Sequence, residues 1–282
     1  MFSNFVKKLK SNLNPRLSLI LPYVLFSLIF IILPLILLVV KAVSPLTTDE
    51  GQQFNNHLLI QQKQTWIIML RSVLLGLGTA FICLVIALPY AFFVSTAKSK
   101  ALKVYAISLM VSPLIIFTIA KTFSLRALFV TMFDEASLNN YWFMLVGLVF
   151  LNLPFMIIPL YTVFRDMPKN ILEASADLGY NKAQTLLKVV LPYGLKAIFS
   201  GIGLVFLMAA TSIIISDKLL PNGSQNQLIG NVINVNANPS NPFDLARTSS
   251  LVLITIIVMM AVYGLVYLFP IIIMKMRGVK HD

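Results

Sequence analysis

Long apolar stretches separated by short polar segments run through almost the whole sequence. A helix needs about 20 mostly apolar residues to cross a hydrocarbon core that is ~30 Å thick. Stretches close to or above that length cover residues 17–43, 72–94, 104–120, 141–164, 195–216 and 249–274. The pattern therefore predicts an all-α polytopic membrane protein with six transmembrane helices.

The composition supports this interpretation. Of the 282 residues, 58% are hydrophobic and 11% are charged, and the mean hydropathy is +0.87. Soluble domains usually carry about 25% charged residues, and a soluble fold of this length could not bury so much apolar surface. Because the apolar stretches fill nearly the whole chain, we expect one domain over residues 1–282, embedded in the lipid of the cell membrane.

The distribution of basic residues predicts the orientation. The net charge is +12, and the 22 Lys and Arg residues lie mostly between the apolar stretches. Fifteen of them fall before residue 17, in 98–103, in 165–196 and after residue 274, against seven elsewhere. Basic residues concentrate in cytoplasmic loops, so both termini are expected in the cytoplasm. No basic helix or aromatic-studded sheet is visible, so we expect no nucleic-acid partner.

Residues that could carry enzymatic or metal chemistry are scarce. The single cysteine, Cys83, lies inside an apolar stretch, and His57 and His281 are far apart, so we expect no metal site. No Gly-x-x-x-x-Gly-Lys-Ser/Thr motif and no Ser/His/Asp or Cys/His set is visible. The chain is therefore not expected to be an enzyme or to hold a cofactor. If ATP drives its activity, a separate subunit must hydrolyse the ATP.

The polar segment of residues 165–192 differs from all the others, because it is long and patterned as two short helices. Gly179 is placed to end the first helix as a glycine with positive φ. Asn181, with Gln184 three residues later, resembles a capping box that opens the second helix. The second helix is expected to stop near Pro192, where the chain re-enters the membrane.

The first of these short helices has two different faces. One face carries mostly small or apolar side chains at helical spacing: Ile171, Ala174, Ser175 and Leu178. Another face carries charged side chains four residues apart: Lys169, Glu173 and Asp177. A cytoplasmic helix with a small-residue face can lie in a groove of a partner and pass its motion to the spans. A helix that merely lies on lipid is the alternative, but it needs larger apolar side chains than Ala and Ser.

The same residues resemble the EAA signature of ABC importer permeases, which reads Glu-Ala-Ala, three residues, Gly, nine residues, Ile, one residue, Leu-Pro. At the same spacing, this chain has Glu173, Ala174, Ser175, Gly179, Val189, Leu191 and Pro192. Ser175 and Val189 are the two departures from the signature. The resemblance implies a MetI-like, type I ABC importer permease fold and a cytoplasmic ABC ATPase as partner. The residues that it assigns to contact with that ATPase are Glu173, Ala174, Ser175, Asp177, Gly179, Leu191 and Pro192.

A wider resemblance points to the spermidine/putrescine permeases, and to their PotB type. It rests on the segments Leu153–Tyr161, Met167–Pro168, Leu172–Ala174, Leu228–Gly230 and Asp244–Ala246, and on residues 121–124, where those proteins often have Arg followed by an aromatic and a small residue. The resemblance implies that the solute is a polyamine such as spermidine or putrescine. It also implies a second permease subunit of the PotC type and an external substrate-binding protein or lipoprotein.

The candidate residues for a substrate route are one carboxylate and several aromatic residues. A polycation that crosses a membrane needs negative or carbonyl-rich surfaces along its route, and Asp217 lies at the outer end of the fifth apolar stretch. Phe117, Phe123 and Tyr161 can offer cation–π contacts. Permeases of this family often carry a glutamate shortly before the aligned aspartate, whereas residues 212–216 contain none.

Three alternatives to a polyamine importer remain open from the sequence. An ion-coupled secondary transporter or channel needs ionisable residues within its spans, and the apolar stretches hold almost none. A membrane assembly factor without transport activity and an ABC permease for another small solute are the other two. An importer permease should bind an ATPase subunit in detergent, whereas a secondary transporter, a channel or an assembly factor should not.

Overall fold

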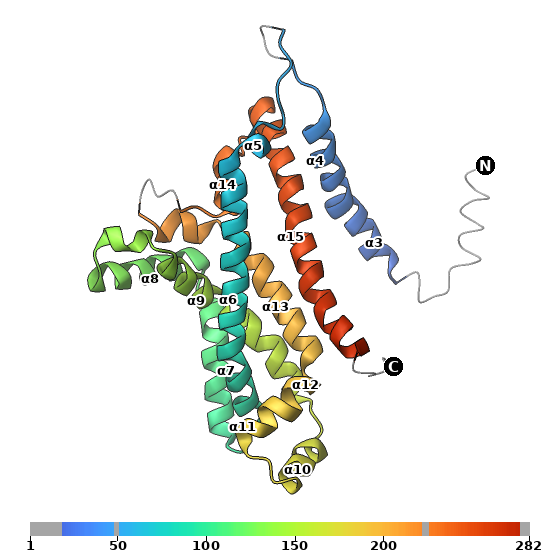
Figure 1. Cartoon of the computed structure of the whole chain (residues 1–282), viewed down its shortest axis with the longest axis vertical. Coiled ribbons are helices and arrows are strands. Elements are labelled where there is room, and N and C mark those ends of the chain that lie inside the picture. The colour runs from blue at the N-terminus through green and yellow to red at the C-terminus, as the bar shows by residue number, and fades with distance from the viewer. Residues whose placement is uncertain (1–18, 48–50, 222–225, 277–282) are drawn as a thin grey trace, which may run out of the picture. The chain divides into compact units, whose positions relative to one another are not determined.

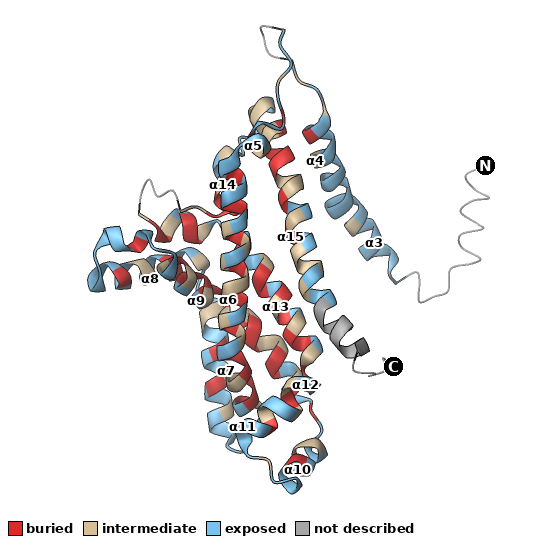
Figure 2. Cartoon of the chain, viewed as in Figure 1, coloured by how far each residue is buried: buried red, intermediate tan, exposed pale blue. Residues whose placement is uncertain are grey.

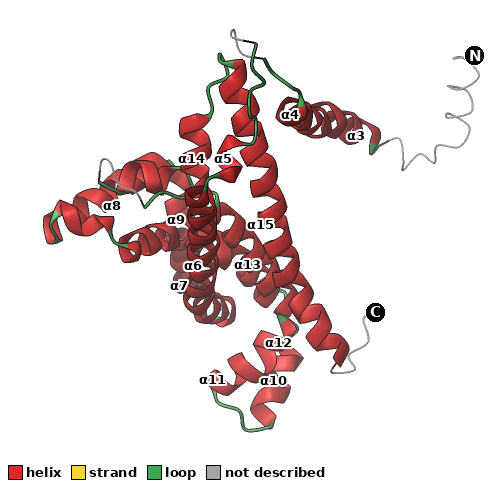
Figure 3. Ribbon diagram, turned by 45° about the horizontal axis from the view of Figure 1, so that its top comes forward, coloured by secondary structure: helices red, strands yellow, loops and turns green. Residues whose placement is uncertain are grey.

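The computed structural model describes residues 19–47, 51–221 and 226–276, with side-chain detail as far as residue 268. The basic segments at both ends of the chain, which contribute to the predicted orientation, lie largely outside the described residues. Helices dominate the described part, and its only extended pairing is an isolated bridge between Thr47 and Gln53 (Figure 3). The predicted all-α fold class is thereby confirmed.

The chain divides into two units, and each is described by itself. The smaller unit combines residues 1–59 with 238–253, and the larger combines 60–237 with 254–282. In the smaller unit, the helical elements are α3 (Leu21–Ser27), the π-helical η1 (Leu28–Ile32), α4 (Leu33–Val43) and the first residues of α15 (Pro242–Met276). The apolar side chains of α3 and α4 are almost all exposed, as expected of a lipid-facing helix (Figure 2).

Polar contacts close the smaller unit at the end of α4. Asn56 donates from Nδ2 to the carbonyl oxygens of Ala42, at 3.1 Å, and Ser44, at 2.8 Å. The hydroxyl of Ser250, on α15, donates to the same Ala42 oxygen at 3.2 Å. These bonds satisfy the carbonyl groups that the last turn of a helix leaves without intrahelical partners.

The larger unit is a helical bundle around α6, α9 and α13, which pack against one another (Figure 1). Its helical elements are α6 (Lys63–Thr96), α7 (Lys100–Ile115), α8 (Thr118–Met132), the 3₁₀ turn η2 (Glu135–Asn139), α9 (Tyr141–Arg165), α10 (Lys169–Asp177), α11 (Lys182–Thr185), the π-helical η3 (Leu186–Val190), α12 (Leu191–Tyr193), α13 (Leu195–Ala210), the π-helical η4 (Ile215–Leu219), α14 (Ile229–Asn236) and the later part of α15. The short α5 (Leu58–Gln61) precedes α6.

The number of candidate membrane spans depends on how two bent helix pairs are counted. Four helical stretches of the described chain are long and apolar enough by themselves: Leu21–Val43, α6, α9 and α15. Two further pairs are long and apolar enough only when each pair is counted as one span. These are α7 with α8, which meet at 99°, and the α11–α12 stretch with α13, which meet at 79°. The count is therefore four, or six if each bent pair is one span. The expected span over residues 104–120 crosses the first of these bends.

Two of the π-helical segments directly precede a proline. Leu28–Ile32 is followed by Leu33 and Pro34, and Leu186–Val190 is followed by Leu191 and Pro192. A proline cannot donate the hydrogen bond to the carbonyl four residues earlier. A wider π turn takes up this mismatch without ending the helix, so the helical structure continues through each proline.

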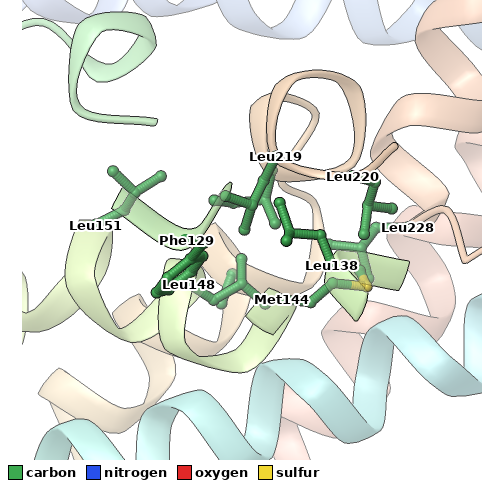
Figure 4. Close-up of a cluster of buried hydrophobic side chains, with 10 residues drawn as sticks. Phe129, Leu138, Met144, Leu148, Leu151, Leu219, Leu220 and Leu228 are labelled. Atoms are coloured by element: carbon green, nitrogen blue, oxygen red, sulfur yellow. The ribbon is translucent and has the colours of Figure 1, made fainter. Parts of the chain in front are cut away.

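One apolar cluster holds the bent pairs together in the larger unit (Figure 4). Its members come from α8, η2, α9, α13, η4 and the chain that leads to α14: Phe129, Leu138, Met144, Leu148, Leu151, Ala209, Ile215, Leu219, Leu220 and Leu228. All ten are at most 9% exposed. The cluster therefore fixes both bent pairs against α9, and α9 is the element that positions the site described below.

Candidate functional site

The segment between α9 and α13 contains a rigid helix–turn–helix. After α10, Gly179 takes φ +74°. Its N–H donates to the Ala176 oxygen at 2.8 Å, and the N–H of Tyr180 donates to the Ser175 oxygen at 3.2 Å. This pair of bonds is a Schellman motif, which needs a residue in the left-handed region after the helix. The prediction that Gly179 ends the first helix with a positive φ is confirmed.

The predicted capping box at the start of α11 is also confirmed. The side chain of Asn181 accepts from the backbone N–H of Gln184 at 2.8 Å, and the side chain of Gln184 accepts from the N–H of Asn181 at 3.0 Å. These two bonds satisfy N–H groups that the start of a helix otherwise leaves free. The turn between α10 and α11 is therefore fixed at both sides.

The side chains of α10 divide into an inner and an outer set. Ser175 is 2% exposed, and its hydroxyl lies 2.7 Å from that of Thr185 on α11, which is also buried. Glu173, Ala174 and Asp177 are exposed, as is Leu178 at 70%. The sequence placed Ser175 on one face with Ala174, but the structure turns it inward, where Thr185 offers a hydrogen-bond partner. Ser175 therefore positions α10 and does not form part of its outer surface.

The two remaining signature residues lie beyond η3. Leu191 is half-buried, and Pro192 is exposed at the bend that leads into α13. On the other side, α10 and α11 lie against the end of α6, around a hollow lined by Phe93, Lys98, Tyr180 and other residues. The helix–turn–helix thus lies against the end of α6, and its α11 is also the first helix of the second bent pair.

A second site is a pocket at the bend between α7 and α8 and at the interruption between α13 and η4. Its volume is about 460 Å³. Its walls come from the end of α7, the start of α8, the middle of α9 and the break after α13: Leu114, Ile116, Phe117, Thr118, Lys121, Leu151, Asn152, Phe155, Met208, Thr211, Ser212, Ile213 and Ile214. Both interruptions of helical structure therefore open into the same space.

Two polar side chains stand out in this pocket, and neither is among the site residues predicted from the sequence. Lys121 is 7% exposed and Asn152 is 5% exposed. Asn152 donates from Nδ2 to the Leu148 oxygen at 2.7 Å. An asparagine inside one apolar stretch and a lysine directly after another are the signal that could have identified them. The bend after Ile115 is not visible in hydropathy, so the expected span 104–120 ends just before Lys121.

The chain before α14 braces the wall of this pocket. The backbone N–H of Leu228 donates to the hydroxyl of Ser216 at 2.9 Å, and that of Ile229 donates to the hydroxyl of Ser72 at 2.8 Å. A Cβ atom at Gly230 would lie 2.1 Å from the carbonyl oxygen of Thr211, which no side chain could accommodate. Glycine at this position therefore lets α14 lie directly on the break after α13.

The three residues predicted for the substrate route are not brought together. Asp217 lies on η4 with its side chain 45% exposed, and its Oδ2 is 2.9 Å from Nζ of Lys218. Phe123 is half-exposed on α8. Tyr161 is buried on α9 with the guanidinium of Arg165 5.9 Å from its ring centre. None of the three lines the pocket, whereas Phe117, noted alongside them, does.

A helical membrane chain whose two interrupted spans open into one pocket has the features of a permease. Residues 82–274 match the family described as binding-protein-dependent transport system inner membrane components, and the chain belongs to this family. It is therefore a translocation subunit with several membrane spans. The predicted MetI-like fold is confirmed by this match.

The similar proteins include several spermidine/putrescine permeases. A spermidine/putrescine transport system permease protein PotB homolog from Mycoplasma genitalium is 31% identical, covering 92% of this chain and 94% of its own. The PotB protein of Escherichia coli is 27% identical, covering 85% of this chain and 91% of its own. A bacterial ABC transporter involved in the import of the acidic polysaccharide alginate shares the fold, with a TM-score of 0.65 at 18% identity over 89% of this chain and 96% of that chain.

Proposed function

We propose that this chain is one permease subunit of an ATP-driven importer whose cargo is a polyamine, either spermidine or putrescine. The observation that carries the proposal is the likeness to PotB proteins along most of the chain, at 27–34% identity. A second permease subunit of the PotC type completes the route across the membrane. An external substrate-binding protein or lipoprotein delivers the polyamine.

The helix–turn–helix of residues 165–192 is the contact with a separate ABC ATPase, which hydrolyses the ATP in the cytoplasm. Exposed Glu173, Ala174, Asp177 and Gly179 form the outer surface that meets the ATPase. Ser175 holds α10 against α11, and Leu191 and Pro192 carry the motion into α13. We also propose that both termini lie in the cytoplasm, and the distribution of basic residues supports this.

The pocket at the two breaks is the part of the substrate route that this chain supplies. The C-terminal ends of α7 and α13 both reach the pocket, and helix C-termini carry partial negative charge from their free carbonyl groups. Such carbonyl ends attract cations in transporters with interrupted spans. In this pocket, the carbonyl ends of α7 and α13 offer a polyamine the polar contacts that carboxylates supply in other cation routes. Asp217 attracts the polyamine at the outer entrance, and Phe123 and Tyr161 flank the route.

Uptake of labelled spermidine tests the proposal. Proteoliposomes with the complete complex should take up spermidine when ATP and the binding protein are present, and omission of this chain should abolish uptake. A complex whose ATPase responds to another solute, but not to spermidine or putrescine, would keep the permease class and reject the polyamine. A chain that binds no ATPase in detergent would reject the coupling role of residues 165–192.

A further inference from the structure

Lys121 is a buried cation without a counter-charge in the pocket. It is 7% exposed. The ion pairs of the described residues involve Arg126, Arg165, Lys218 and Arg247, and none includes Lys121. The pocket lining holds no Asp or Glu. A buried charge is costly unless it is paired or has a function, so the retention of a lysine at this place calls for a functional explanation.

The helix ends around the pocket do not neutralise Lys121. The free C-terminal carbonyl groups of α7 and α13 each correspond to roughly half a negative charge. The N-terminus of α8, which has no acidic residue in its first turn and no side-chain cap, adds roughly half a positive charge from the same wall. The two C-terminal ends together offset only the ammonium group. The pocket therefore keeps a positive excess of roughly half a charge.

We propose that Lys121 is an electrostatic barrier that keeps the resting permease closed to small inorganic cations such as K⁺ and Na⁺. The inference rests on the proposed role of the pocket as part of the transport route. A route with carbonyl-lined walls attracts cations in general, so it conducts K⁺ between transport cycles unless a fixed positive charge opposes it. Fixed positive groups exclude cations from other membrane pores in this way. Passage of a polyamine then requires the ATP-driven step to move α8, and with it the ammonium group, away from the route.

Cation leak through the complete complex measures the barrier directly and requires neither ATP nor polyamine. Lys121→Met should raise the passive K⁺ permeability of proteoliposomes by roughly tenfold to a hundredfold, the effect of one unit charge about 6–12 Å from the ion at an effective dielectric constant near 20. Lys121→Arg should remain as tight as the wild type, because it keeps the charge. Lys63→Met is the matched control, since Lys63 is exposed at the start of α6 and lies outside the pocket.

Chloride and glycerol fluxes distinguish a lost charge from a damaged fold. If Lys121 is the barrier, K⁺ permeability should rise in Lys121→Met while chloride and glycerol permeability stay at the wild-type level. An assembled Lys121→Met complex that remains tight to K⁺ would overturn the proposal, and so would one that leaks glycerol as much as K⁺. Spermidine uptake, measured separately, tests the proposed cargo, so failure of one proposal can be told from failure of the other.

Discussion

Substitution of Gly179 should impair coupling through the backbone of the turn. The residue has φ +74°, and nothing lies within 4 Å of the place where a Cβ atom would be. An added side chain meets no neighbour in this chain, so the cost within the chain is conformational. An L residue in the left-handed region costs about 1–2 kcal/mol, which changes the population of the turn by roughly fivefold to thirtyfold. Asn adopts this region more readily than Ala, and a β-branched residue adopts it least.

ATP-driven spermidine uptake should therefore fall in a fixed order across a substitution series. Gly179→Asn should stay within about twofold of the wild type, Gly179→Ala should lose roughly fivefold, and Gly179→Val should lose roughly thirtyfold or more. The assay is uptake by proteoliposomes with the complete complex, normalised to the amount of assembled complex. The ATPase that co-purifies with each variant is measured in parallel, because a displaced α10 should weaken this association in the same order.

Gly51 provides a matched control for strain without coupling. It has φ +76° and also has nothing within 4 Å of a Cβ position, but it lies in the smaller unit, outside residues 165–192. Gly51→Ala carries the same conformational cost and should leave uptake near the wild-type level. Normal uptake in Gly179→Val with full ATPase association would refute the reasoning. An equal loss in Gly51→Ala and Gly179→Ala would assign the effect to general stability.

Three further predictions follow from the same geometry. Ser175→Ala leaves the Thr185 hydroxyl buried without a partner, so it should destabilise the complex by about 1–3 kcal/mol, and adding Thr185→Val should restore part of the loss in a melting experiment. In a cysteine-free background, a cysteine at Val235, which is 71% exposed, should react with an impermeant thiol reagent on intact cells, whereas one at Lys182 should not; the reverse result overturns the orientation. Asp217→Asn should slow polyamine uptake about twofold at low salt and leave it unchanged at high salt, because exposed charges are screened; a loss that persists at high salt would place this carboxylate inside the route.

Local sequence signals predicted the helix–turn–helix well. Gly179 and Asn181 act on backbone groups a few residues away, so their roles can be read without knowledge of the tertiary fold. The direction of Ser175 could not be read in the same way, because it depends on Thr185 in the next helix. Both Ala and Ser fit a small-residue face, and only the packing of α10 on α11 separates them.

The pocket could not be predicted, because it depends on the bend between α7 and α8, and a hydropathy pattern does not show bends. The apolar residues continue without interruption through the bend at Ile116 and Phe117, so a count of apolar residues runs straight across it. Lys121 therefore falls just outside the expected span 104–120. Asp217 was selected for its charge, but η4 leaves it paired with Lys218 and outside the pocket lining.

The bend between α7 and α8 also carries a cost in lipid. The helix stops at Ile115 and resumes at Thr118, and Ile115 and Phe117 are 81% and 71% exposed. The terminal N–H and C=O groups at such a break lack intrahelical partners, and each unsatisfied group costs several kcal/mol in hydrocarbon. If the proposed second permease subunit packs on this bend, its assembly with this chain removes that cost and is stabilised accordingly.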